Sequence, residues 1–212
     1  MDLDAIGREL RAGFDAKNAA REMALPLCRK VVRFSANAIR AVHRSDEAET
    51  ARLLAEARRC LDEAYAAMVG HADVLHAGFF HDAAKEYAEA RLTQALVRGL
   101  PLPAPAEVGV EAPAYLNGMG EAVGELRRHL LDLMRQGNLG RSEELLGTMD
   151  GIYALLMSMD YPEAITGGLR RTADAIRAIV ERTRGDLTTT LIQAKLQAAL
   201  EAARAEVSPS VT

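Results

Sequence analysis

Residues 21–44, REMALPLCRKVVRFSANAIRAVHR, carry apolar side chains at the three- and four-residue spacing of an α-helix. Side chains at this spacing share one face, which we expect to pack inward. That face holds Ala24, Leu27, Val31, Phe34, Ala38 and Val42. Helical periodicity continues on both sides of this segment, and the β-branched clusters typical of strands are almost absent. The sequence therefore predicts an all-α protein.

The composition is that of a folded, soluble-type chain. Of its 212 residues, 49% are hydrophobic and 26% are charged, as in globular domains. The net charge of −4 creates no global field for nucleic acid, so an anionic partner needs a local basic surface. Two cysteines, Cys28 and Cys60, are too few for a disulfide framework or a thiolate metal site. No run approaches the roughly 18 apolar residues of a membrane span, so we expect a cytoplasmic protein without a membrane partner.

Glycine, proline and capping residues divide the chain into helical segments. Four of the seven prolines fall within residues 99–113, which we interpret as an internal loop because proline interrupts a continuous helix. Neither side of the loop has its own compositional signature, so we predict a single domain over residues 1–206 and a flexible tail at 207–212. The expected helices span residues 3–20, 21–45, 47–69, 79–98, 114–136, 142–158, 162–184 and 186–205.

A row of positive charge lies on the outer face of the predicted helix 21–45. At 3.6 residues per turn, its four arginines fall within an arc of roughly 60°. Exposed helix faces usually alternate in charge sign, whereas Glu22 is the single acid among residues 21–44. This basic stripe consists of Arg29, Lys30, Arg33, Arg40 and Arg44. It predicts binding to phosphates, with a solvated face that binds nothing as the alternative.

Several carboxylates occupy positions where helices are expected to pack. Glu86 and Glu89 lie opposite the polar stripe of the predicted helix 79–98, and Asp150 also lies on an apolar face. Glu125 belongs to a polar flank and on its own is expected to face solvent. Buried carboxylates require neutralisation by an arginine, a proton or a cation. If they converge, they form an all-oxygen site suited to Mg²⁺ or Mn²⁺, while pairing with arginines is the alternative.

Other catalytic chemistries lack a motif in this chain. No glutamate is followed three residues later by the histidine that a di-iron bundle requires. There is also no glycine-rich phosphate loop and no serine or cysteine nucleophile elbow. The carboxylates therefore remain the candidates for catalysis.

Two stretches in the second half of the chain resemble archaeal-type translin proteins: residues 160–174, DYPEAITGGLRRTAD, and residues 181–188, ERTRGDLT. Residues 20–23, 29–35 and 38–44 resemble the N-terminal helices of the same family. The resemblance implies a translin-like bundle of about seven helices. It also implies assembly into a hollow homo-oligomer, often an octamer, that holds single-stranded RNA or DNA inside.

Within this family, translin mainly binds nucleic acid, while translin-associated factor X supplies a metal-dependent endoribonuclease site. Residues 85–90, KEYAEA, resemble the Glu-Tyr-x-Glu-Ala motif of the catalytic subunit. Shorter matches surround Glu125 in Gly-Glu-Leu and Asp150 in Met-Asp-Gly. The resemblance implies that Glu86, Glu89, Glu125 and Asp150 are metal ligands and catalytic residues.

Together these features predict a Mg²⁺- or Mn²⁺-dependent endoribonuclease that cleaves single-stranded RNA, with the basic stripe anchoring phosphates. Two other functions stay open. One is a non-catalytic single-stranded RNA- or DNA-binding scaffold that needs a second subunit for activity. The other is a purely structural helical assembly.

Overall fold

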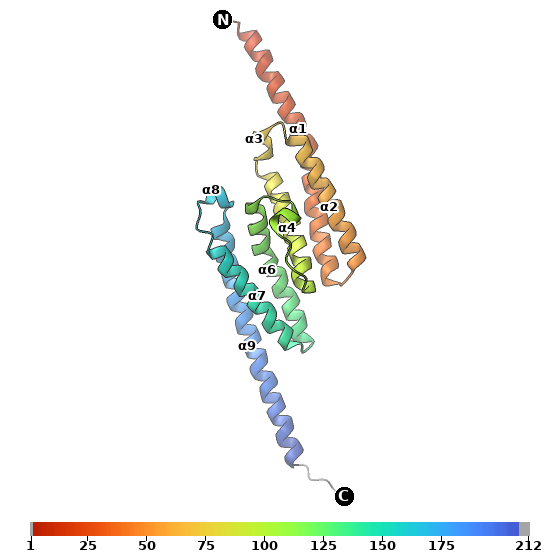
Figure 1. Cartoon of the computed structure of the whole chain (residues 1–212), viewed down its shortest axis with the longest axis vertical. Coiled ribbons are helices and arrows are strands. Elements are labelled where there is room, and N and C mark those ends of the chain that lie inside the picture. Colours follow the sequence, from red (N-terminus) through yellow and green to blue (C-terminus); the bar gives the residue numbers. More distant parts are fainter. Residues whose placement is uncertain (1, 208–212) are drawn as a thin grey trace. The chain divides into compact units, whose positions relative to one another are not determined.

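The structure, a computed structural model, describes the backbone of residues 2–207 and the side chains of residues 2–204. This part of the chain forms nine α-helices and no strand, which confirms the all-α prediction (Figure 1). The long helices are α1 (Leu3–His43), α2 (Glu47–Met68), α4 (Phe79–Arg98), α6 (Ala112–Arg135), α7 (Leu139–Met157) and α9 (Leu169–Val207). Two single turns, α3 (Ala72–Leu75) and α5 (Pro105–Val108), were not expected. The expected helix 162–184 is interrupted at Gly167 and Gly168, so that the single turn α8 (Glu163–Thr166) precedes α9.

The helices divide into two compact units. Unit 1 comprises Met1–Ala122 and Tyr161–Leu169, and unit 2 comprises Val123–Asp160 and Arg170–Thr212. The single-domain organisation over residues 1–206 stays a prediction. Of the expected tail at 207–212, Val207 ends α9, and residues 208–212 lie outside the described part of the chain.

The core of unit 1 is built where α1 packs against α2 and α4. On the inward face expected for α1, Ala24, Val31, Ala38 and Val42 are buried, while Leu27 and Phe34 are half-buried. Small residues at α1 and α2 positions such as Ala38, Ala41 and Ala57, all 0% exposed, allow the helix axes to approach closely. The same packing leaves the opposite face of α1 at the surface.

The largest difference from the expected helices is that two pairs merge into single helices. α1 runs without interruption through Pro26, and α9 runs through Gly185, where breaks near residues 20 and 185 were expected. Proline inside a helix costs about 3 kcal/mol and glycine about 1 kcal/mol. Pro26 is exposed and lies between Ala24 and Val31, which are both fully buried, so packing of this face outweighs the local cost.

Capping residues explain where the other long helices begin. The Asp46 side chain accepts a hydrogen bond from the Glu49 backbone N–H at 3.1 Å and starts α2, as expected from its sequence. Asn138 caps α7 by accepting from the Arg141 N–H at 3.3 Å, so this helix begins three residues before the expected position. Within the proline-rich loop, Pro105 occupies the first turn of α5, where a missing N–H costs nothing.

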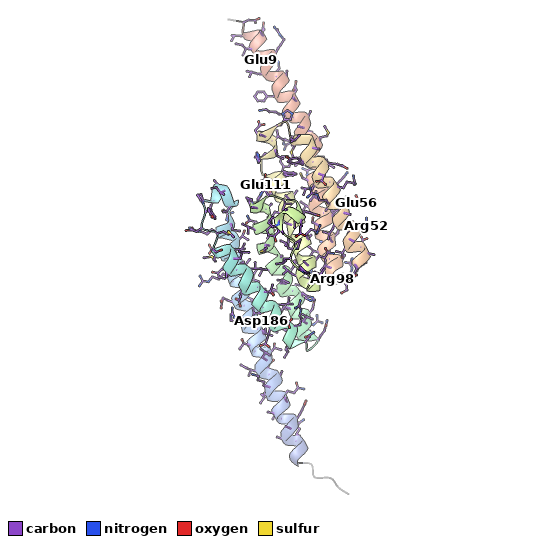
Figure 2. The ribbon with its side chains drawn as sticks, in the orientation of Figure 1. Glu9, Arg52, Glu56, Arg98, Glu111 and Asp186 are labelled. Atoms are coloured by element: carbon purple, nitrogen blue, oxygen red, sulfur yellow. The ribbon has the colours of Figure 1, made fainter. Side chains whose placement is uncertain are left out.

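Unit 2 has its own apolar core and a polar clamp between helices. Leu126, Leu130, Leu145, Met149, Ile152, Ile176 and Val180 are all buried. At the edge of this core, Arg127 donates hydrogen bonds to Thr183 at 2.9 Å and to Asp186 at 2.7 Å (Asp186 is labelled in Figure 2). The clamp ties the second half of α6 to α9. Among the described helices, none is both long and apolar enough to cross a lipid bilayer.

Candidate functional site

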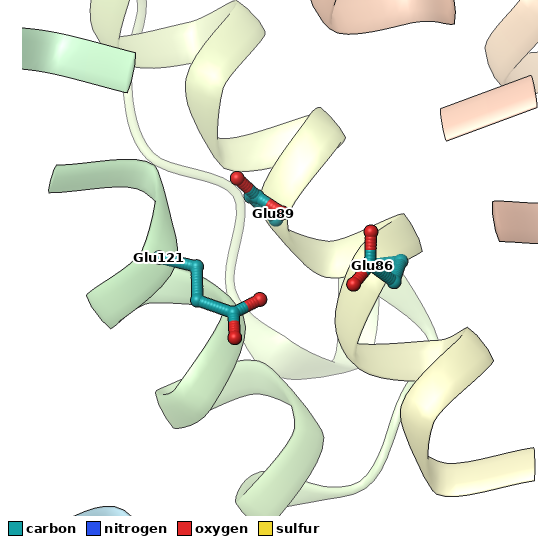
Figure 3. Close-up of side chains that lie close together, drawn as sticks. All are labelled: Glu86, Glu89 and Glu121. Atoms are coloured by element: carbon teal, nitrogen blue, oxygen red, sulfur yellow. The ribbon is translucent and has the colours of Figure 1, made fainter. Parts of the chain in front are cut away.

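Three glutamates from two helices of unit 1 lie together. Glu86 and Glu89 project from α4, and Glu121 extends from α6 toward them (Figure 3). Each offers one carboxylate oxygen, and these oxygens all lie within 4.8 Å of one another. All three residues are half-buried, so Glu86 and Glu89 do point toward other parts of the protein. We call this group the carboxylate cluster.

Gly118 sets the register that brings Glu121 to this cluster. A Cβ atom at Gly118 would lie 2.7 Å from the Lys85 carbonyl oxygen and 2.9 Å from the Glu89 backbone nitrogen. α6 therefore touches the backbone of the α4 turn that carries Glu86 and Glu89. Glu121 follows Gly118 by three residues, about one turn, and so lies on the same side of α6.

Asn117 fixes the same end of α6 to another segment of unit 1. Its side-chain amide donates to the Pro113 and Thr166 carbonyl oxygens, each at 2.9 Å. Asn117 is 4% exposed, so these bonds satisfy an amide that burial would otherwise penalise. The result is a fixed first turn and a half of α6, from which Glu121 reaches α4.

Lys85 supplies positive charge to the carboxylate cluster. Its Nζ atom lies 2.5 Å from Glu121 Oε1 and 3.6 Å from Glu86 Oε1. Burial alone would lower the pKa of Lys85, but the hydrogen bond and charge of Glu121, with the charge of Glu86, raise it. Burial raises the pKa of Glu86, and the charges of Glu121 and Asp82 add to this effect, whereas Lys85 opposes it.

The cluster fits a hard divalent cation. All of its donor atoms are carboxylate oxygens, the ligands that Mg²⁺, Mn²⁺ and Ca²⁺ prefer. The three oxygens lie within 4.8 Å of one another, and two oxygens bound to the same Mg²⁺ ion are at most about 4.2 Å apart, so the side chains would have to draw together around the ion.

Glu121 was not among the metal ligands expected from the sequence, although the structure places it in the carboxylate cluster. The useful signal was Gly118, because an isolated glycine inside a helix often marks a close approach to another backbone. The turn of α4 that Gly118 approaches depends on the register between α4 and α6, which cannot be predicted from the sequence of either helix alone.

The other two expected ligands, Glu125 and Asp150, belong to unit 2 and have cationic neighbours there. Asp150 Oδ1 accepts a hydrogen bond from Arg184 Nη2 at 2.6 Å, and its side chain is 40% exposed. Glu125 is half-buried rather than exposed, with Oε2 lying 3.9 Å from Arg128 Nη1. The roles of Glu125 and Asp150 as metal ligands stay predictions.

The basic stripe is exposed along the outer face of α1. All five of its residues, Arg29, Lys30, Arg33, Arg40 and Arg44, are exposed. Among the described residues, none of its four arginines has a carboxylate oxygen within 4.0 Å; the Arg40 guanidinium donates instead to Asn37 at 2.8 Å. Its charges are therefore available to a polyanion.

The exposed arginines of α2 differ from the stripe because carboxylates neutralise them. Arg52 pairs with Glu49 at 2.7 Å, and Arg59 pairs with both Glu56 and Glu63, at 2.8 and 2.6 Å (Arg52 and Glu56 are labelled in Figure 2). Two adjacent helices of one unit thus show the two contrasting charge patterns. Only the α1 pattern suits phosphate binding.

Comparison with known proteins gives relatives of similar length. No protein-family model matches the chain. An uncharacterized protein of Methanocaldococcus jannaschii is 29% identical over 187 residues, which cover 85% of this chain and 81% of that protein.

Solved structures similar to this chain carry the name C3PO. The AfC3PO structure in complex with duplex RNA has a TM-score of 0.75 and 28% identity, covering 91% of this chain and 98% of that one. A crystal structure of AfC3PO has a TM-score of 0.74 and the same identity and coverage. The apo-NeC3PO structure has a TM-score of 0.76 at 17% identity, covers 89% of this chain and 97% of that one, and supports the fold alone.

Proposed function

We propose that the chain is a Mg²⁺- or Mn²⁺-dependent endoribonuclease that cleaves single-stranded RNA, and its likeness to the AfC3PO structures supports this proposal. The main support for this proposal is the carboxylate cluster of Glu86, Glu89 and Glu121, which offers three oxygen ligands for a cation between α4 and α6. The AfC3PO complex with duplex RNA supports RNA as the class of partner. We further propose that the active form is a homo-oligomeric shell, with an octamer as the expected state.

In this proposal one group of residues binds the metal ion and another group binds the RNA. Glu86, Glu89 and Glu121 hold the cation, with Glu125 and Asp150 as further candidates. A bound divalent cation would polarise a phosphate oxygen and lower the pKa of a coordinated water. The basic stripe binds phosphates without reading bases, so affinity should fall with salt and depend little on sequence.

The test is cleavage of a labelled single-stranded RNA by the full-length protein in Mg²⁺, Mn²⁺ or excess EDTA, with retention of the RNA followed in parallel. A duplex of the same sequence establishes which form is bound and which is cut. Metal-dependent cleavage should be lost in Glu86→Gln and Glu89→Gln, while RNA binding and helical content are retained. Glu9→Gln, an exposed glutamate on α1, is the control that should cleave normally.

The rival function is a non-catalytic RNA-binding scaffold. The ion pairs of Lys85 with Glu121 and of Arg184 with Asp150 favour it, because these carboxylates already have cationic partners. Retention of RNA without cleavage in every metal condition would establish the scaffold and overturn the nuclease. Absence of salt-sensitive binding would overturn both and leave a structural assembly.

A further inference from the structure

We propose that Lys85 is an internal counter-ion of the carboxylate cluster, and that a divalent cation must displace its ammonium group in order to bind. The inference rests on the proposed metal centre and concerns its regulation. Lys85 belongs to the same turn of α4 as Glu86 and Glu89, yet its ammonium reaches Glu121 on α6, 36 residues away in sequence. It therefore bridges the two helices that form the cluster.

Distance makes the ammonium and a bound metal ion competitors. With Nζ 2.5 Å from Glu121 Oε1, an Mg²⁺ ion bound to that same oxygen would lie within about 4.6 Å of Nζ, whatever its direction. Lys85 Nζ also lies 3.6 Å from Glu86 Oε1, so the ammonium occupies space that an ion shared by Glu86 and Glu121 would need. Two cations this close repel strongly at a partly buried site, where screening by water is incomplete.

The Lys85 side chain can make way for the ion. It is 20% exposed, so its head group has a route to solvent, and its four-carbon stem allows rotation without movement of α4. Its departure would free one oxygen of Glu121 and remove one positive charge from beside the cluster. Lys85 thus stabilises the metal-free protein and raises the metal concentration at which the cluster fills.

This role has an effect that a purely structural ion pair lacks. If Lys85 only held α4 to α6, its removal would loosen the cluster and weaken metal binding. If it competes with the metal, removal strengthens metal binding while it lowers the thermal stability of the metal-free protein. The two roles predict opposite signs for the same affinity measurement.

The experiment compares Mn²⁺ binding by the full-length wild type and Lys85→Met, with free Mn²⁺ measured by electron paramagnetic resonance. Methionine keeps most of the stem and removes the charge. We expect the dissociation constant of Lys85→Met to fall by about tenfold or more, because one unit charge acts on the ion from under 5 Å. Its melting temperature in EDTA should fall, and Lys85→Arg should bind Mn²⁺ much as the wild type does.

Lys17→Met is the matched control, because Lys17 makes a 2.6 Å ion pair with Asp73 elsewhere in unit 1. It should leave Mn²⁺ binding unchanged. Wild-type binding with equal or weaker binding by Lys85→Met would overturn the inference and leave the metal centre standing. If neither the wild type nor Lys85→Met binds Mn²⁺, the proposed metal centre and this inference both fail.

Discussion

Glu86 is a residue at which function and stability oppose each other. Burial is the main cause that raises its pKa, so the folded protein favours the protonated carboxyl. An acid with a raised folded-state pKa stabilises the fold below its ordinary pKa, and this contribution is lost as the pH rises through the folded-state value. Above the folded-state pKa, the ionised Glu86 therefore destabilises the metal-free protein.

From this sign we expect metal-free Glu86→Gln to be at least as stable as the wild type at neutral pH. As the pH rises above the ordinary glutamate pKa of about 4.3, the wild type should lose more stability than the variant. Thermal melts in EDTA across this rise in pH measure the difference. Glu9→Gln should follow the wild type, and a clearly less stable Glu86→Gln at neutral pH would mean that the carboxylate is stabilising.

Added Mg²⁺ should make the wild type more stable than Glu86→Gln, the reverse of the order expected without metal. A ligand that binds only the folded state raises the melting temperature, so the wild type should gain stability and Glu86→Gln should gain less or none. The same melts repeated with Mg²⁺ measure the gain. Equal gains in both proteins would place the bound ion away from Glu86.

At the residue scale, the sequence predicts which side chains lie together on one helix, but it does not predict which side chains of two different helices meet. Glu86 and Glu89 are three residues apart, so the period of a single helix places them on one face. Glu121 joins them only because Gly118 meets the Lys85–Glu89 backbone, a contact between segments more than 25 residues apart. The same holds for the ion pair between Lys85 and Glu121.

The contact between α4 and α6 predicts the effect of filling Gly118. The nearest atoms are the Lys85 carbonyl oxygen and the Glu89 nitrogen, and backbone atoms cannot rotate away as a side chain can. We expect Gly118→Ala to destabilise the protein by about 1–3 kcal/mol, the usual cost of overpacking, and to weaken Mn²⁺ binding as α6 is displaced. Urea unfolding and Mn²⁺ titration measure the two effects.

Gly124, six residues further along α6, is the matched control. A Cβ there meets nothing within 4 Å, so Gly124→Ala should be neutral or stabilise the protein by up to about 1 kcal/mol through helix propensity. Equal stability of the Gly118→Ala and Gly124→Ala proteins would contradict the close approach of α6 to α4.

The two charge patterns on α1 and α2 predict different effects on RNA binding. Replacing Arg33 and Arg40 by Gln should weaken single-stranded RNA binding to a similar extent for all sequences. It should also reduce the slope of log affinity against log salt by about 0.7 for each phosphate that the protein no longer neutralises. Arg52→Gln with Arg59→Gln is the control, because these arginines are neutralised by glutamates. Fluorescence anisotropy across a salt series measures both pairs.

Helix positions could be predicted more reliably than helix ends. The 79–98 prediction coincides with α4, whose end is marked by Gly99 at a positive φ of 66°, a local signal. The breaks expected near residues 20 and 185 do not occur, because buried neighbours on the same face keep each helix continuous. Local signals therefore place helix ends well only where packing does not overrule them.

At the scale of the whole molecule, the N-terminal part of α1 and the C-terminal part of α9 expose apolar side chains at helical spacing. On α1 these are Leu3, Ile6, Leu10 and Phe14, and on α9 they are Ile192, Leu196 and Leu200. Each is 45% exposed or more. Single exposed apolar residues are common, but a continuous row along a helix marks a surface that another chain covers. The expected occupant is a second copy of this chain, in line with the proposed homo-oligomer.

Negative charge introduced into the row of exposed apolar residues on α9, which we call the α9 row, should therefore reduce the number of chains in the assembly. We expect Leu196→Glu with Leu200→Glu to reduce the molar mass in light scattering after size-exclusion chromatography, while the helical signal of the chain is retained. Ala194→Glu with Ala198→Glu adds the same charge to the opposite, exposed face of the same helix and should keep the wild-type mass. If both double variants keep the wild-type mass, the α9 row is not an assembly surface.

The same pair of variants also tests whether RNA is held inside an assembly. A closed shell slows the exit of a bound strand, so the dissociation rate of RNA should rise when the shell is broken. A smaller Leu196→Glu, Leu200→Glu species that releases RNA faster than the control would support internal binding. A smaller species with an unchanged release rate would show that the basic stripe of each chain binds RNA independently, and the shell would then need another purpose.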